Sequence, residues 1–405
     1  MDKPKFERVY TLEQQTPLIH FQYDQPGATL RATEVKPKLD KFIIKKMKEK
    51  GEKIPKEWVV NGESEALDYK LKFSCANIRC VNIGRRTDYD IYYGNMGDEH
   101  VKGVLCSGIE MTIICFQIKL HAAIKEAICD FFIANNFGRM KSKGFGSFLI
   151  VKIDDEKIGN PGLNDIANIL MKEYGAKVCY SFDGGNTPFK RIKTVYSLMK
   201  SGINFGKNYR RSLLFMYMHS LGLDNEKAWM KQNKIAPNDV FKDGNEDRYK
   251  KYRNGLRKPQ SPYYVRALLG TGDHYDFLTE VGNFSEESKI KVKVSSKEIE
   301  RYNSTVFYKV IDNIVYYVGK RINKDIFGKL FDFERYNYQK KTPSVTGQLS
   351  TPSKNENVNR DFMDGFLEYC YKYFNNPVDG GTKLEDFYGM RDVKIKKYSK
   401  ENNDI

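Results

Sequence analysis

The spacing of hydrophobic and polar residues divides the first 155 or so residues into six elements. Four strands are predicted: Glu7–Gln15 and Leu67–Cys75, where apolar and polar residues alternate, Gly108–Ile118, which is rich in β-branched residues, and Ser147–Ile153. Apolar side chains three and four positions apart, the pattern of a helix, occur between Pro37 and Gly51 and over Leu120–Asn135. The polar stretch Asn77–Val101 predicts an irregular insertion. The order strand, helix, strand, strand, helix, strand predicts an α+β fold with a ferredoxin-like (RRM-like) βαββαβ domain over residues 1–157.

Residues 158–405 have weaker patterns, which predict a second, elaborated α+β domain that we also expect to be ferredoxin-like. Helical spacing occurs in five segments: Leu163–Tyr174, Pro188–Ser201, Tyr209–Leu221, Asn225–Gln232 and Phe362–Phe374. We therefore expect a helical insertion at about 161–235. Strand-like patterns occur in four segments: Val178–Phe182, Tyr263–Leu269, Lys289–Val294 and Thr305–Val318, the last with a turn at Asp312-Asn313. The polar composition at about 338–360 predicts a mobile loop.

A surplus of positive charge narrows the classes of partner. The chain has 68 lysines and arginines against 52 aspartates and glutamates, a formal net charge of +16. A basic surface attracts polyanions and releases their counterions on binding, so the surplus favours a nucleic acid. Aromatic residues make up 13% of the chain, and such rings stack on the bases of single-stranded RNA. The alternative is that the surplus of charge is incidental.

The cysteines and the short apolar runs argue against several other classes of protein: zinc-binding, membrane-spanning and secreted. The chain has seven cysteines, an odd number, and no Cys-x-x-Cys pair, which indicates small buried side chains in a reducing cytoplasm. Cys75 and Cys80 lack a second pair of zinc ligands. The sequence has no run of 18 apolar residues that could span a membrane. No apolar core follows its first residues as it would in a signal peptide. We therefore expect a cytoplasmic protein without metal, cofactor, membrane or small-molecule ligand.

A glycine-rich segment between Phe137 and Ser147 concentrates the chemistry of the first domain. Its candidate RNA-binding residues are Gly138, Arg139, Lys141, Ser142, Lys143, Gly144, Phe145 and Gly146. Glycine lets the backbone approach a ligand closely, and exposed amides and cations then bind phosphate oxygens. The segment lacks the Gly-x-x-x-x-Gly-Lys-Ser/Thr pattern of a Walker loop, which disfavours a nucleoside triphosphate site. Two alternatives stay open: a tight turn whose cations are solvated, and a core position instead of base stacking for Phe145.

Cations between the first strand and the first helix form a second candidate. Arg31, Lys36 and Lys38 lie in a connection that runs along one end of the sheet in a ferredoxin-like fold. At that end the side chains can line a path for RNA. The alternative is the solvated start of a helix.

With this order of elements, the pattern Gly-Arg-x-Lys-Ser-x-Gly-Phe-Gly-Ser at 138–147 resembles the RAMP superfamily of CRISPR-Cas proteins. Within it, the chain is most similar to the family of the first-named subunit of the Cmr (type III-B) effector complex. That similarity rests on three further motifs: Thr16-Pro17-Leu18, Leu30-Arg31-Ala32 and Arg301-Tyr302-Asn303-Ser304. Two segments depart from the family: Ala32–Lys36 replaces an arginine-rich, tryptophan-containing stretch, and Ser304-Thr305 replaces a Ser-Pro pair.

The resemblance implies a subunit near the 3′ end of the crRNA in a ribonucleoprotein that recognises invading RNA. Members in that role bind RNA without cutting it. We therefore expect a non-catalytic subunit in antiviral defence whose partners are crRNA, target RNA and other RAMP subunits. The resemblance also adds Arg301 to the candidate RNA-binding residues.

Two residues after the first strand keep a catalytic alternative open. His20 lies where RAMP processing endonucleases often hold a catalytic histidine, and histidine can act as a general base at an RNA 2′-hydroxyl. Asp24 lies where RAMP backbone subunits that cleave target RNA hold an aspartate. Both kinds of enzyme are much shorter than 405 residues. The alternatives are therefore a metal-independent endoribonuclease that uses His20, and a protein-interaction module whose glycine loop is purely structural.

Overall fold

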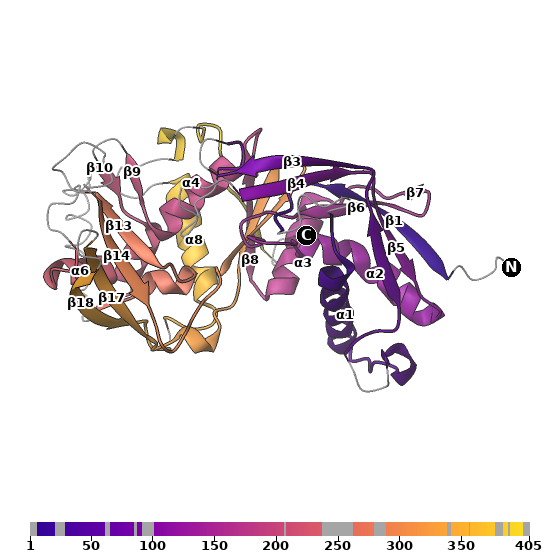
Figure 1. The fold of residues 1–405 in the computed structure, drawn as a ribbon, viewed down its shortest axis with the longest axis horizontal. Helices are drawn as coiled ribbons and strands as arrows, with labels where there is room; N and C mark the ends of the chain where they lie inside the picture. Colours follow the sequence, from indigo (N-terminus) through magenta and orange to yellow (C-terminus); the bar gives the residue numbers. More distant parts are fainter. Residues whose placement is uncertain are drawn as a thin grey trace.

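In the computed structural model the chain is an α+β protein with several antiparallel sheets, shown in Figure 1. The structure describes residues 6–20, 29–60, 65–84, 87–90, 101–205, 208–236, 262–278, 289–337, 342–355, 357–376, 384–387 and 389–399. The N-terminal half lies on the right in Figure 1, and the C-terminal half lies on the left.

The N-terminal half is built on a five-stranded antiparallel sheet in the order β2-β5-β1-β6-β7. Its strands are β1 (Glu7–Gln14), β2 (Lys70–Ser74), β5 (Ile109–Ile114), β6 (Phe148–Ile153) and β7 (Glu156–Lys157). Two helices, α1 (Ala32–Glu49) and α2 (Ile118–Ala134), pack against it, and their apolar residues share one core with Tyr10 and Met111 of the strands. The six predicted elements of this half are therefore present.

The start of α1 differs from the prediction. The helix begins at Ala32, so the predicted first residue, Pro37, lies inside it. A proline within a helix removes one backbone hydrogen bond and crowds the preceding turn. Val35 and Leu39 on either side of it are fully buried, and this burial offsets the cost.

The C-terminal half contains a four-stranded antiparallel sheet in the order β15-β16-β8-β19. Its strands are β8 (Val178–Asp183), β15 (Val306–Ile311), β16 (Ile314–Gly319) and β19 (Lys396–Ser399), and the helices beside it are α3 (Leu163–Tyr174), α4 (Pro188–Lys200) and α8 (Phe362–Asn375). The span of the predicted helical insertion, about 161–235, contains the predicted helices, and its predicted strand Val178–Phe182 is β8, which lies inside the sheet. The insertion as a unit stays a prediction. The predicted turn is present at Asp312 and Asn313, which both have positive φ angles.

A second four-stranded antiparallel sheet, in the order β13-β14-β17-β18, lies at the far left of Figure 1. Its strands are β13 (His274–Leu278), β14 (Lys289–Ser295), β17 (Leu330–Asn337) and β18 (Thr342–Ser350). The helices of this region are α5 (Leu213–Ser220), α6 (Glu226–Gln232) and the 3₁₀ helix η3 (Val265–Leu269). Smaller elements complete the fold: β9 (Ile203–Phe205), β10 (Asn208–Arg210), β11 (Asp224–Asn225), β12 (Pro262–Tyr263), η1 (Lys56–Trp58), η5 (Lys324–Ile326) and η6 (Leu384–Asp386).

Two predictions for this region are wrong. The predicted strand Tyr263–Leu269 is mostly η3, because a short apolar run does not distinguish a strand from a buried helical turn. The predicted mobile loop at about 338–360 contains β18. This strand lies at the edge of its sheet and buries little apolar surface, with Leu349 its one buried apolar side chain among the described residues, so its sequence is mostly polar.

The predicted irregular insertion is also wrong for the part that the structure describes, because an arm of two strands forms there. β3 (Asn77–Ile83) pairs with β4 (Val101–Ser107) in an antiparallel ladder. Figure 1 shows this arm along the top of the molecule, reaching from one half towards the other. Past the end of β3, the Asp90 carboxylate accepts a hydrogen bond from Lys193 of α4 at 2.7 Å, which attaches the arm to the C-terminal half.

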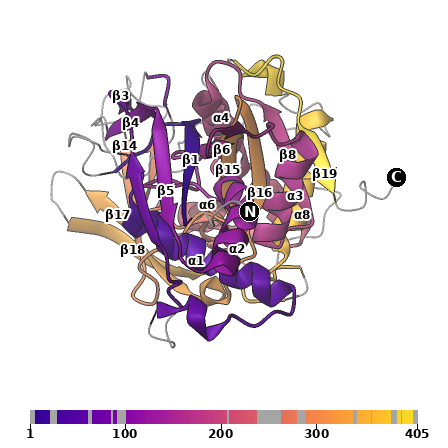
Figure 2. The ribbon, with the colours of Figure 1, turned by 90° about the vertical axis from the view of Figure 1, so that its right-hand side faces the viewer.

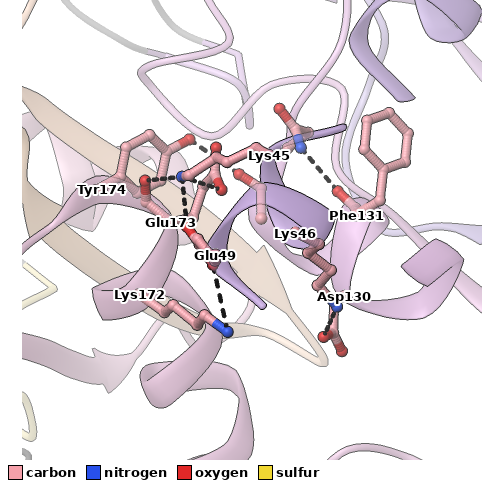
Figure 3. A network of polar contacts seen from close by, with 10 residues as sticks. Lys45, Lys46, Glu49, Asp130, Phe131, Lys172, Glu173 and Tyr174 are labelled. Carbon is pink, nitrogen blue, oxygen red and sulfur yellow. Dashed lines mark hydrogen bonds and ion pairs between the residues drawn. The ribbon is translucent and has the colours of Figure 1, made fainter. Parts of the chain in front are cut away.

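α3 fastens the two halves together, as Figure 3 shows. Lys45 Nζ of α1 donates to Glu173 Oε2 of α3 at 2.8 Å, and Lys172 Nζ of α3 lies 3.5 Å from Glu49 Oε2 of α1. Half-exposed ion pairs contribute little free energy each, so the apolar core beneath them carries the contact. That core joins Ile133 and other residues of the N-terminal half to α3 and β15. The domain boundary at 157/158 stays a prediction.

Candidate nucleic-acid interface

The glycine loop, residues 138–147, leads from α2 towards β6 and divides at Ser142. In the outer loop, Gly138–Ser142, the side chains of Arg139 and Lys141 are exposed. In the inner loop, Lys143–Ser147, every residue is buried. The predicted contacts of Lys143, Gly144, Phe145 and Gly146 with RNA are therefore out of reach of a polynucleotide in this structure. Direct contacts can come from the outer loop.

The inner loop is part of the protein core. The Phe145 ring is fully buried and stacks on Phe189 of α4, with ring centroids 4.1 Å apart, so Phe145 takes the core position that the sequence left open. The Thr16 hydroxyl donates to the Gly144 carbonyl oxygen at 2.7 Å. A Cβ atom on Gly146 would collide with the Phe137 carbonyl group, so this position requires glycine.

β15 of the C-terminal half holds the loop by main-chain contacts. The Tyr308 N–H donates to the Ser142 carbonyl oxygen at 3.1 Å, and the Ser147 hydroxyl donates to the Val310 carbonyl oxygen at 2.7 Å. Figure 2, which views the molecule from the N-terminal half, accordingly shows β6 and β15 next to each other. The loop therefore lies at the junction of the two halves.

Two buried polar side chains complete this attachment. Asn136 donates from its side-chain amide to the carbonyl oxygens of Lys141, at 2.7 Å, and Tyr308, at 2.8 Å. Lys309 of β15 donates to the Asn135 carbonyl oxygen just after α2, at 2.8 Å, and burial holds the pKa of Lys309 well below its usual value. Both residues fix the end of α2 against β15, and this contact determines where the outer loop points.

The outer loop presents Arg139 and Lys141 beside two further lysines. Burial, and then repulsion from the Lys141 charge, lowers the pKa of Lys320, just after β16, to about 8. Burial is also the main cause that lowers the pKa of Lys38 of α1, and Lys141 contributes to that shift. We call Lys38, Arg139, Lys141 and Lys320 the outer-loop cation group. It combines α1, the loop and the C-terminal half, and such a group attracts phosphates.

The carboxylate of Glu34 lies inside this group. Glu34, in the first turn of α1, accepts the Gly138 N–H at 3.0 Å and the Lys38 ammonium at 2.6 Å. The Gly138 N–H, which a phosphate could otherwise accept, is therefore already bonded to a side chain of the protein. The negative charge of Glu34 opposes the approach of a polyanion to the outer loop.

His20 and Arg31 lie beside the outer loop. The carbonyl oxygen of Ile19, the residue before His20, accepts the Arg139 N–H at 2.8 Å. The Arg31 guanidinium lies 3.3 Å from His20 Nδ1. Burial, and then the Arg31 charge, lowers the pKa of His20, which leaves the imidazole neutral and able to accept a proton at neutral pH. Asp24 falls outside the described residues.

Lys36 and Arg301 are not brought into this group. Lys36 donates to Asp40 at 2.9 Å and to the Leu67 carbonyl oxygen at 2.7 Å, so it serves the packing of α1. Arg301 is exposed in the segment before β15. Lys320, which sequence reasoning missed, lies far along the chain from the loop, and no local pattern distinguishes it.

The residues that the structure describes include neither a cluster of metal ligands nor a membrane-spanning helix. No group of three or more histidine, cysteine, aspartate or glutamate side chains among them is arranged to hold a metal ion. None of their helices is both long enough and apolar enough to cross a membrane.

Comparison with known proteins gives two family matches. The model of the Cmr1 N-terminal domain matches residues 6–203, and the model of the Cmr1 C-terminal domain matches residues 209–387. Among solved structures, Cmr1 from Pyrococcus furiosus in its apo form has 10% sequence identity and a TM-score of 0.35, over 79% of this chain and 90% of that chain. A chain of the Type III-B Cmr-beta complex bound to cognate target RNA has 11% identity and a TM-score of 0.26, over 36% of this chain and 59% of that chain. The search of curated proteins found no match.

Proposed function

This chain belongs to the Cmr1 family of type III-B (Cmr) RAMP subunits, and from that membership we propose that it is a non-catalytic, RNA-binding subunit of a type III CRISPR effector complex. Its RNA partners are crRNA and target RNA, and its protein partners are other RAMP subunits. Its role in the complex is to hold the RNA backbone during antiviral defence.

The observation that carries this proposal is the outer-loop cation group, with Arg139 and Lys141 exposed and Lys38 and Lys320 half-buried behind them. Arg139 and Lys141 project from a loop that both halves hold in place, next to Lys38 and Lys320. Contacts of this kind go to phosphates and carry no base information. Binding should therefore tolerate changes in RNA sequence and weaken steeply with salt.

We also propose that both halves are ferredoxin-like. Across the N-terminal sheet the strands run β2-β5-β1-β6, so the second, third, first and fourth of them in chain order lie side by side. Across the C-terminal sheet the strands run β15-β16-β8-β19, which is again the second, third, first and fourth of them in chain order. A shared arrangement with helices in the split βαβ positions supports two related units.

Anisotropy of a fluorescently labelled single-stranded RNA tests the proposed function. The full-length chain is titrated alone and in the assembled effector complex, in EDTA, at several salt concentrations. We expect binding without cleavage, with the logarithm of the binding constant falling linearly with that of the salt concentration. If no binding occurs in either state, the protein-interaction module with a structural loop is the better account.

Glu34→Gln should increase RNA affinity. Removing one negative charge beside the outer loop is worth about 1 kcal/mol near a protein surface, which is about fivefold in affinity. The matched control is Glu126→Gln, which removes an exposed carboxylate of α2 that pairs with Lys50, and it should leave RNA affinity almost unchanged. A loss of affinity in Glu34→Gln alone would contradict the repulsive role and assign Glu34 to supporting the loop.

One observation favours a second function, metal-independent RNA cleavage. His20 is half-buried beside Arg31, and burial together with the Arg31 charge keeps the imidazole in the neutral form that a general base needs. The outer-loop cations could hold the RNA backbone next to it. Cleavage of labelled CRISPR repeat RNA in EDTA, followed by gel electrophoresis, decides between the two functions.

We expect no cleavage by the wild-type chain and unchanged RNA affinity within about threefold in His20→Ala, since the neutral ring adds no charge to the interface. Cleavage that disappears in His20→Ala would replace the proposed function with the endoribonuclease.

A further inference from the structure

A second set of cations lies within the C-terminal half, where α4, α6 and η3 meet around Ser201. Arg266 of η3 donates to the Ser201 hydroxyl at 2.9 Å, and Lys227 of α6 donates to the Ser201 carbonyl oxygen at 3.3 Å. Lys200, the last residue of α4, donates to the Gly270 carbonyl oxygen at 2.5 Å. Three cations from three elements therefore converge within one small region.

Lys143 of the inner loop extends this set. Its side chain is buried, and among the described residues its ammonium nitrogen has no hydrogen-bond partner. That nitrogen lies 2.8 Å from the centroid of the Tyr196 ring, and the Lys200 nitrogen lies 5.9 Å from the same centroid. Burial, and then repulsion from Lys200, holds the pKa of Lys143 well below its usual value. We call Lys143, Lys200, Lys227 and Arg266 the Ser201 cation cluster.

The charges in this cluster repel one another. Burial is the largest cause that lowers the pKa of both Lys200 and Lys227 to about 7, and repulsion from Arg266 is the next. The Glu226 carboxylate acts in the opposite direction, but its oxygens already accept the Tyr275 hydroxyl at 2.7 Å and the Val265 N–H at 3.2 Å. A bound anion would relieve this repulsion and restore the full charge of the lysines.

We propose that Lys200, Lys227 and Arg266 of the Ser201 cation cluster bind a phosphate group, carried by a free nucleotide or by the end of an RNA chain, while the buried Lys143 adds only its charge. Guanidinium and ammonium groups with a nearby hydroxyl form the donor set that phosphate oxygens prefer. Lys200, Lys227 and Arg266 are each half-buried, so part of each side chain is open to solvent at the edge of the cluster. This site uses none of the outer-loop cations, so the proposal does not depend on RNA binding by the outer loop.

Thermal unfolding and calorimetric titration of the full-length protein with inorganic phosphate test this site. Phosphate should raise the unfolding temperature more than sodium chloride of equal ionic strength does. Lys227→Met should weaken phosphate binding about tenfold, the effect of one charge-assisted hydrogen bond. Lys227→Arg should retain binding, and the control Lys119→Met, which removes an exposed lysine of α2, should not change it. Equal stabilisation by phosphate and chloride, or equal phosphate affinity in wild type and Lys227→Met, would overturn the proposal.

A second readout does not depend on any variant. Neutral amines react with N-hydroxysuccinimide esters, so lysines with a pKa of about 7 should be acylated rapidly at neutral pH. Phosphate should slow the acylation of Lys200 and Lys227 severalfold, measured by mass spectrometry, and leave Lys119 unchanged. Adenosine monophosphate and short RNA with or without a 5′-phosphate then identify the source of the phosphate group. If none of these ligands slows the acylation of Lys200 or Lys227, the site does not bind phosphate.

Discussion

Phe145→Ala is expected to lower the free energy of unfolding by about 3–5 kcal/mol, the range for removing a large buried ring. The ring is fully buried and stacks on Phe189 with centroids 4.1 Å apart. Its loss leaves a cavity between the inner loop and α4, and the loop cannot close it because β15 holds the Ser142 carbonyl oxygen on one side of Phe145 and the Ser147 hydroxyl on the other. Urea unfolding followed by circular dichroism measures the change.

Phe116→Ala is the matched control, because it removes the same side chain from the surface. Phe116 is 70% exposed and contacts the ring of Phe6 at a centroid distance of 5.4 Å. We expect a change below about 1 kcal/mol for this variant. Equal effects of the two substitutions would contradict the burial of the inner loop. Loss of RNA affinity in a folded Phe145→Leu variant would restore base stacking as the role of this ring.

The double variant Arg139→Ala/Lys141→Ala is expected to bind RNA at least about tenfold more weakly at physiological salt, because it removes two phosphate contacts. The slope of log affinity against log salt should fall in magnitude by about 1.4, which is about 0.7 for each contact with a single strand. Both side chains are exposed, so the fold should be unaffected. Anisotropy titrations at four or more salt concentrations measure both quantities.

The double variant Lys119→Ala/Lys125→Ala provides the control with the same change in net charge. Both lysines are exposed on α2, and Lys119 lies near the end of the helix remote from the loop, roughly 24 Å from it at 1.5 Å per residue. That separation exceeds the screening length at physiological salt, so affinity should change less than about twofold. If both double variants weaken binding equally, the RNA is attracted by net charge and not by the outer loop.

The elements of the N-terminal half could be predicted because each has a local signature. Glu7–Gln14 alternates along its length, and α2 has apolar residues at helical spacing. The β15–β16 turn was also predictable, since Asp312 and Asn313 adopt the positive φ angles that aspartate and asparagine tolerate. Local periodicity and turn chemistry therefore account for the elements that could be predicted from the sequence.

The division of the glycine loop could not be predicted, because it depends on residues remote in the chain. Phe145 is buried by Phe189 of α4, and the backbone of the loop is bonded to β15. Lys320 joins the outer-loop cation group only because β16 ends beside Lys141. The arm β3–β4 and the edge strand β18 were missed for a related reason: strands with little buried surface do not need an apolar pattern.

Photo-crosslinking of RNA that contains 4-thiouridine to the full-length chain, followed by mass spectrometry of the crosslinked peptides, tests the central claim most directly. The account predicts crosslinks to the peptide with Arg139–Ser142, and none to the buried Phe145. Crosslinks confined to other surfaces, with the outer loop unmodified, would contradict it.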